Sequence, residues 1–271
     1  MKVFTKEGVI CLVALTMSSV SHAQTSAQLN VGIASYKLDL TQGDISIEDD
    51  VPYGRFALSH GIASNIAISA YYVAWGEGSN SFEEQSTRPG LGNVSANRNF
   101  DFDRNEYSLA LSFGLPLDNN ALDEDDIIDR GRLSLVTGYR WSETNATSVT
   151  KGVTTGFDFD QKFEMNIEAN GPYIGLSYHL PKLPIGLIGL SLAAGLMSFE
   201  ATSFAEGQEG GTSFTIEGTS EDSFLSSVVG IKWSNNFEQI GYGLSAEYFN
   251  YEYDVLSEKS LALTASISTG F

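Results

Sequence analysis

The sequence of 271 residues contains a single cysteine, Cys11, and only three histidines. Cys11 lies in an N-terminal segment with the features of a leader, so the rest of the chain has no thiol for disulfide bonds or thiol chemistry. Basic residues are also scarce, with 15 lysines and arginines against 34 aspartates and glutamates, a formal net charge of −19. Because such an acidic chain repels nucleic acid, we expect no nucleic-acid partner.

The sequence also lacks a long apolar run after its N-terminal segment. The nearest candidate for a membrane helix, Pro184 to Met197, is shorter than the roughly 20 residues that a spanning helix needs, and glycines interrupt it. Closed barrels satisfy their backbone groups in lipid as well as helices do. The lack of a membrane helix therefore does not exclude a membrane protein made of strands.

The first 23 residues have the composition of a secretory signal peptide. Two lysines stand near the start, residues 9–17 are apolar, and a small-x-small cleavage site ends at Ala23. We therefore expect residues 1–23 to be removed during export through the periplasm, leaving residues 24–271 as one mature domain. Cleavage leaves 13 basic and 33 acidic residues, a net charge of −20.

The mature chain alternates apolar with small or polar residues, which is the period of a β-strand. In the last thirteen residues, for example, one face carries Leu261, Leu263 and Ile267, whereas the other carries serine, alanine, threonine and glycine. The alternation predicts ten strands. These lie at residues 29–40, 54–62, 66–74, 106–115, 132–141, 172–180, 187–199, 224–233, 240–248 and 259–271.

The predicted connections are alternately short and long, as in an antiparallel barrel with short periplasmic turns and long outer loops. Residues 77–104, rich in glycine, serine and asparagine, are predicted as one of the loops. Residues 145–169 are ambiguous: two further membrane strands would give twelve in all. We prefer a hairpin that extends the sheet above the membrane, since one face of this segment carries many charges.

Strands with one apolar and one small polar face are typical of transmembrane barrels. The C-terminal strand, which ends on Phe271, resembles the last strand of bacterial outer-membrane β-barrels of the small porin-like, OmpA-like and OmpX-like class. In that class the terminal aromatic is part of the assembly signal. The resemblance implies a location in the cell outer membrane, with the barrel-assembly machinery, membrane lipid and lipopolysaccharide as partners.

We therefore predict an all-β fold: a single antiparallel transmembrane β-barrel of about ten strands, with eight or twelve as alternatives. A secreted sandwich would also alternate, but its outer face would carry more charge. Aromatic residues near the strand ends predict two interfacial girdles. One comprises Trp75, Trp141, Tyr248, Tyr251 and Tyr253, and the other comprises Phe113, Tyr178, Trp233 and Phe271.

The sequence offers little for catalysis. The omptin proteases, which are ten-stranded outer-membrane enzymes, use a carboxylate pair with an Asp-x-His arrangement. The segments 101–103 and 158–160 each contain two aspartates, but the histidines of the mature chain, His60 and His179, lie near short turns. His60 is also at the wrong depth for a lipase of the outer leaflet. We expect no enzyme, no cofactor and no resident metal.

Strand parity predicts that seven titratable side chains face the lumen: Arg55, Glu106, Arg132, Arg140, His179, Lys232 and Glu247. Four of them are Lys or Arg and only two are glutamates, and unmatched cations need water beside them. We therefore favour a narrow porin-like passage for small solutes, with a preference for anions.

The alternative is a non-conducting barrel that acts through its acidic outer loops in adhesion, envelope integrity or recognition. It remains open because barrels of about eight strands are filled by their own side chains. Small solutes and divalent cations are further expected partners, since carboxylate oxygens bind Ca²⁺ and Mg²⁺.

Overall fold

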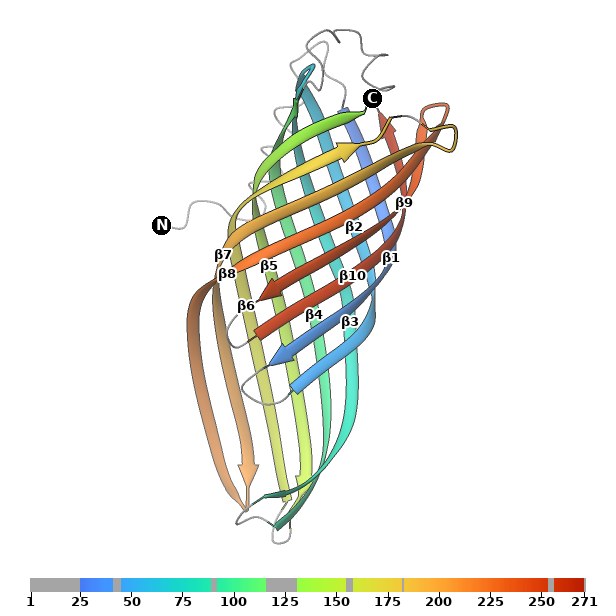
Figure 1. Cartoon of the computed structure of the whole chain (residues 1–271). Coiled ribbons are helices and arrows are strands. Elements are labelled where there is room, and N and C mark those ends of the chain that lie inside the picture. The colour runs from blue at the N-terminus through green and yellow to red at the C-terminus, as the bar shows by residue number, and fades with distance from the viewer. Residues whose placement is uncertain are drawn as a thin grey trace.

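Ten antiparallel strands close into one barrel in the computed structural model of the chain (Figure 1). The structure describes residues 25–40, 45–88, 92–115, 131–154, 158–181, 183–252 and 256–270. The predicted signal peptide, the terminal Phe271 and almost all of the acidic connection at 116–131 lie outside the described residues. The prediction of an all-β barrel of ten strands is confirmed.

Each strand pairs with its neighbours in the chain, and β1 pairs with β10 to close the barrel, with Ser26 opposite Gly270. In the described ranges there is no helix long and apolar enough to cross a membrane. The strands are β1 Thr25–Leu40, β2 Ile45–Ala63, β3 Ile66–Arg88, β4 Gly92–Leu115, β5 Arg132–Val153, β6 Asp158–His179, β7 Leu187–Glu209, β8 Thr212–Phe237, β9 Ile240–Glu252 and β10 Leu256–Gly270.

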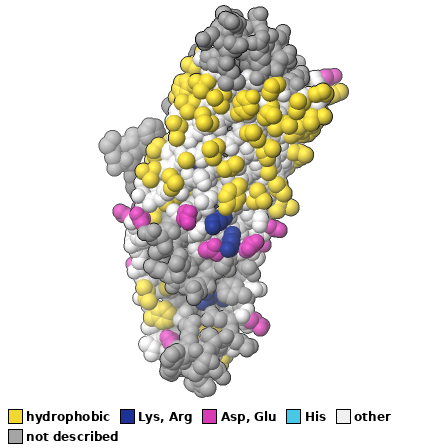
Figure 2. Space-filling model, viewed as in Figure 1, with side chains coloured by type: hydrophobic (Ala, Val, Ile, Leu, Met, Phe, Trp, Pro, Cys, Tyr) yellow, Lys and Arg dark blue, Asp and Glu magenta, His cyan; other side chains and the backbone are white. Residues whose placement is uncertain are grey.

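An apolar belt surrounds the half of the barrel that lies nearest the short turns and the strand ends at Thr25 and Gly270. Figure 2 shows this belt over the visible face as a nearly continuous hydrophobic band. A contiguous apolar surface of this size on a closed barrel is stable in lipid and unstable in water. Its exposed members include Leu29, Val31, Ile33, Phe56, Ile174, Leu176, Leu190, Leu192, Leu196, Leu225, Val229, Ile231, Leu244, Leu261, Leu263 and Ile267.

Aromatic pairs border the belt, but the predicted girdle is partly wrong. Tyr139 packs on Trp141 with ring centroids 4.7 Å apart at the far border of the belt. By contrast, Trp75 and Tyr251 are buried inside the barrel, with 3% and 2% of their surfaces exposed. Both stand at positions where strand parity points the side chain inward, and the ring is drawn into the interior rather than to the lipid interface.

The wall of the barrel is much taller on one side than on the other. The short side comprises β9, β10, β1 and β2, with 13 to 19 residues each. The long side comprises β3 to β8, with 22 to 26 residues each. Beyond the belt, the long side continues as the extension, which consists of residues 76–88, 92–103, 143–153, 158–169, 198–209 and 212–223 (Figure 1).

The extension corrects one prediction and confirms another. Residues 77–104 do not form a loop, because most of them belong to the paired strands β3 and β4, with Gly78 opposite Phe102 and Arg88 opposite Gly92. The polar composition of this segment reflects an outer face in water, whereas its inner face packs around Phe100 and Phe102. Residues 145–153 and 158–169 form the two arms of the expected hairpin above the membrane, as the upper parts of β5 and β6.

Candidate functional site

The interior of the barrel contains a layer of four buried charged residues, called here the ionic layer. It comprises Arg104 and Glu106 on β4, Arg140 on β5 and Glu258 on β10. Each lies at a position whose side chain points inward, so strand alternation brings side chains from opposite walls together. At most 4% of the surface of any of these residues is exposed.

Glu106 stands at the centre of the ionic layer. Its carboxylate is 3.1 Å from Nε of Arg140 and 3.7 Å from Nη2 of Arg104. The hydroxyl of Tyr71 donates a hydrogen bond of 3.0 Å to Oε1, and that of Tyr251 donates one of 2.9 Å to Oε2. A fully buried carboxylate is thus held by two cations and two hydroxyl donors, as such a group requires.

The other carboxylate of the layer, Glu258, forms an ion pair with Arg104. The Arg104 guanidinium also donates to the Thr144 hydroxyl at 3.1 Å and lies 4.6 Å from the ring centroid of Tyr251. With two arginines and two glutamates, the ionic layer is electrically balanced. It also joins the two sides of the wall, because Glu258 comes from the short side and the other three members from the long side. Tyr251, also on the short side, donates to Glu106.

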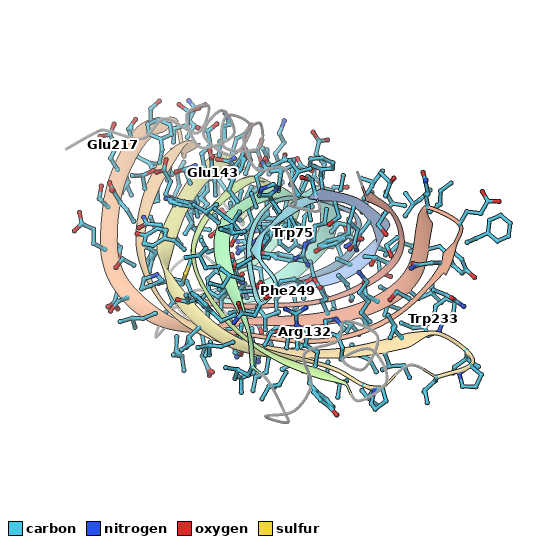
Figure 3. The ribbon with its side chains drawn as sticks, turned by 90° about the horizontal axis from the view of Figure 1, so that it is seen from above. Trp75, Arg132, Glu143, Glu217, Trp233 and Phe249 are labelled. Atoms are coloured by element: carbon cyan, nitrogen blue, oxygen red, sulfur yellow. The ribbon has the colours of Figure 1, made fainter. Side chains whose placement is uncertain are left out.

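On the extension side of the ionic layer, buried aromatic and aliphatic side chains fill the interior. We call this cluster the apolar plug. Tyr36 stacks on Phe102 with ring centroids 4.6 Å apart, and Trp75 meets Phe249 edge-on at 5.8 Å. Figure 3 shows Trp75 and Phe249 near the centre of the barrel. The larger members of the apolar plug are Tyr36, Leu38, Val51, Tyr53, Val73, Trp75, Phe100, Phe102, Ile167, Met197, Phe199, Phe224 and Phe249.

On the turn side of the ionic layer there is a cavity of about 150 Å³, lined by Tyr53, Tyr71, Arg140, Tyr173 and Phe249 among others. Arg55 and Glu247 also line it, and their side chains form an ion pair of 2.8 Å. A cavity of this size holds only a few water molecules. The interior therefore changes from a small, mainly apolar cavity with one ion pair to the ionic layer and then to the apolar plug, whose Tyr53 and Phe249 also reach the cavity wall.

The structure brings four of the predicted lumen residues together in two pairs. Arg140 lies beside Glu106 in the ionic layer, and Arg55 lies beside Glu247 below it. Lys232 instead donates a hydrogen bond of 2.7 Å to Oε1 of Gln28. These inward-facing contacts account for five of the seven predicted residues.

The other two predicted residues, Arg132 and His179, stand opposite each other on β5 and β6 at the turn end. Arg132 lies over Gly114, where the absence of a side chain leaves room for its guanidinium group. His60 is at the same end, and its Nδ1 is 2.8 Å from the hydroxyl oxygen of Thr25. Phe271, the predicted assembly signal, is outside the described residues, so its role stays a prediction.

Sequence reasoning missed half of the ionic layer. Arg104 was assigned to a loop, although it lies two residues before Glu106 and so shares its inward parity. Glu258 was placed just before the last predicted strand, whereas β10 begins at Leu256. Continuing the alternation beyond the apolar segments would have found both residues. Tyr71 and Tyr251 share the inward parity of their strands, but parity does not indicate which carboxylate they contact.

The carboxylate pairs considered for a protease do not approach a histidine. Asp101 and Asp103 lie on the outward face of β4, and Asp158 and Asp160 are exposed at the start of β6. Both described histidines lie at the opposite end of the barrel. Within the described ranges, no three or more histidine, cysteine, aspartate or glutamate side chains are grouped to hold a metal ion.

No protein family model and no curated protein matches the sequence. Among solved structures, the chain is similar to the outer-membrane protease OmpT from Escherichia coli, with 14% identity, 92% of this chain and 97% of that chain covered, and a TM-score of 0.61. The chain has the fold of a bacterial outer-membrane β-barrel. At this identity the likeness extends to the fold alone, and it agrees with the apolar belt.

Two further matches have lower TM-scores. The translocator domain of the autotransporter NalP from Neisseria meningitidis gives 0.41, with 10% identity over 97% of this chain and 93% of that chain. The attachment invasion locus protein Ail of Yersinia pestis, in complex with a heparin analogue, gives 0.34, with 11% identity over 90% of this chain and 98% of that chain.

Proposed function

We propose that this protein is a non-conducting barrel of the outer membrane that acts through its extension in recognition or adhesion at the cell surface. The observation that carries the proposal is the filled interior, with the ionic layer on one side and the apolar plug on the other. An ion that crossed the barrel would have to separate buried ion pairs and then enter an apolar core, and both steps are costly.

This proposal reverses the preference for a porin-like passage. That preference depended on four cations facing only two glutamates, so that water had to fill the lumen. Glu258 supplies a third carboxylate and Arg104 is matched within the same layer. Arg55 has Glu247 as its partner, and Lys232 has Gln28. Arg104 also adds a fifth cation, so an excess of two cations over carboxylates remains among these residues. It lies at Arg132 and Lys232 near the turn end, where water is needed, and not in the ionic layer.

The extension supports a role outside the membrane. It is built from six strands that continue well beyond the apolar belt, and a barrel that served only as an anchor would not need them. Its outer face carries many carboxylates, including Glu143, Glu168, Glu200 and Glu221. The aspartate pairs face outward without a histidine, which favours binding over hydrolysis.

Contact with lipopolysaccharide and insertion by the barrel-assembly machinery are also proposals. They rest on the belt and on the C-terminal aromatic residue of the sequence. Divalent cations remain a candidate partner of the acidic outer face, because hard cations prefer carboxylate oxygens.

Conductance of the purified, refolded protein in a planar bilayer tests the non-conducting state. We expect no steps for the native protein, and brief openings for a Glu106→Ser/Arg140→Ser/Trp75→Ala/Phe249→Ala variant, which removes two members of the ionic layer and two large side chains of the apolar plug. The variant shows that the assay detects an opened lumen. Stable conductance of the native barrel would overturn the proposal and restore the porin-like passage.

A further inference from the structure

One border of the extension is an unprotected strand edge. β8 begins at Thr212, but β9 pairs with it only from Leu225 onward, where Leu225 is opposite Glu252. Residues 212–223 pair with β7 alone, and no other strand within the described ranges covers their second edge. Along such an edge, every second residue turns its N–H and C=O groups outward, ready to pair with another strand.

The opposite border of the extension, on β3, is protected where it begins, at Gly76 to Ser79. On β2, Pro52 lies against Gly76 of β3 and has no N–H to donate to a ladder. The carboxylate of Asp49 accepts a hydrogen bond of 3.0 Å from the backbone N–H of Ser79. The ladder between β3 and β4 is also irregular between Trp75 and Gly78. Natural sheets block their edges with such features. Residues 212–223 of β8 contain no proline and no break in the ladder to β7, although the Asp222 carboxylate accepts a hydrogen bond from the N–H of Ser223.

The side chains around the β8 edge are acidic. Residues 200–223 contain six aspartates and glutamates and no lysine or arginine. Glu217, Thr219 and Glu221 alternate on the outer face, and Figure 3 shows Glu217 on the outside of the curved sheet. The inner face carries Ile216, which is 61% exposed. Both faces of this segment are thus open to solvent, which suits a strand that gains a neighbour.

A row of glutamates adds negative charge beside this edge. Four neighbouring strands place a glutamate at the same level, with Glu143 opposite Glu168, Glu168 opposite Glu200 and Glu200 opposite Glu221. Like charges directly opposite each other on one face are destabilising. A cationic partner beside Glu221 would relieve part of this repulsion.

We propose that the β8 edge at residues 212–223 binds an extended cationic polypeptide by strand addition. Two lysines or arginines four residues apart would face Glu217 and Glu221, because alternate residues of a strand share a face. The second and fourth residues of such a five-residue segment would lie on the inner face, opposite Gly218 and Ser220, where β-branched side chains fit. The inference rests on the proposed role of the extension in recognition.

The charges of the β8 edge favour a cationic polypeptide over a second copy of the chain. Pairing β8 with β8 of another copy would bring Glu217 and Glu221 against acidic residues of the same segment, with no basic residue in 200–223 to offset them. A cationic strand satisfies both the backbone edge and the carboxylates. The backbone ladder then supplies affinity, and the alternating side chains supply specificity.

Binding of a fluorescent peptide with the core Lys-Val-Thr-Val-Lys tests the proposal by anisotropy, with refolded protein in detergent. We expect saturable binding that weakens by about tenfold or more when proline replaces both the central threonine and one neighbouring valine. The change keeps the charge, and one of two consecutive residues must donate its N–H to the ladder. Equal binding of both peptides would overturn strand addition and leave only charge attraction.

Charge-reversal variants locate the site. Glu217→Lys/Glu221→Lys should abolish binding of the lysine peptide and create binding of the matching Glu-Val-Thr-Val-Glu peptide. Glu83→Lys/Asp101→Lys makes the same change in net charge elsewhere on the extension and should leave lysine-peptide binding within about twofold of the native value. Loss of binding in both variants would overturn the assignment to β8.

Two other results separate this inference from the function proposed above. Disulfide cross-linking of a Thr219→Cys variant into dimers in detergent would replace the peptide by a second copy and overturn the inference. A barrel that conducts ions but binds the lysine peptide would overturn only the proposed function. A barrel that conducts no ions and fails to bind the lysine peptide would overturn only strand addition.

Discussion

The short and long sides of the wall show how one strand period produces two environments. On the short side, β9 and β10 end soon after the apolar belt, so most of their outward residues face lipid. On the long side, the same alternation continues for several residues into water, and the outer face changes from leucine and isoleucine to asparagine, aspartate and glutamate. The inner face keeps aromatic residues such as Phe100 and Phe102. Packing within the interior, rather than lipid, therefore supports the extension.

The ionic layer connects the two sides, and its loss should have the largest effect. In Glu106→Ala, Arg104 and Arg140 lose their shared carboxylate while remaining buried. We expect the free energy of unfolding to fall by about 3–5 kcal/mol, the usual cost of breaking a buried ion pair by removing one partner. Urea unfolding in detergent, followed by tryptophan fluorescence and gel mobility, measures the change.

The matched control for this prediction is Glu258→Ala, which removes a carboxylate contributed by the short side. If the ionic layer holds the two sides together, both variants should destabilise the whole barrel to a similar extent. A loss below about 1 kcal/mol in either would mean that the layer is not a structural link.

Phe102→Ala should distinguish the extension from the belt region. The ring stacks on Tyr36 and is 3% exposed, so its removal leaves a cavity in the apolar plug. We expect a cost of about 3 kcal/mol, concentrated in the extension. Hydrogen exchange should accelerate in the upper parts of β3 and β4 while the belt region stays protected.

A conservative Phe102→Leu variant serves as control, and it should retain most of the protection. Equal acceleration of exchange throughout the barrel in Phe102→Ala would show that the two regions unfold as one unit. The extension and the belt region would then differ in surface composition but not in stability.

Lys151→Ala should have the smallest effect. Lys151 is 3.7 Å from Asp160 near the tip of the β5–β6 hairpin, and their side chains are 70% and 60% exposed. Exposed ion pairs contribute about 0–1 kcal/mol, so we expect a change near the error of the unfolding measurement. A loss above about 1.5 kcal/mol would indicate that the tip is more enclosed than its exposure suggests.

Strand parity predicted which residues of the belt face lipid and which face inward, because an alternation of period two is local. Leu261, Leu263 and Ile174 face outward as expected. The extension was harder to predict, since a strand with a solvated outer face resembles a loop when its inner face is ignored. Trp75 was misplaced for a related reason: an aromatic at a strand end fits both a girdle and a plug.

Contacts across the lumen were beyond sequence reasoning. Arg104 and Glu258 are 154 positions apart, and their meeting depends on strand tilt and on the register of every ladder between them. A shift of two residues in one strand keeps the parity but moves a side chain to another level. The sequence could therefore indicate inward charges such as Glu106 and Arg140, but the grouping of partners required the closed barrel.

The balanced charge of the ionic layer has an electrical consequence. The energy that a membrane potential supplies is about 2.3 kcal/mol for each elementary charge moved across 100 mV. Two arginines and two glutamates that move together carry no net charge, so the potential does no net work on their displacement. The closed state should therefore be insensitive to voltage. This distinguishes the interior of this barrel from that of a voltage-gated channel.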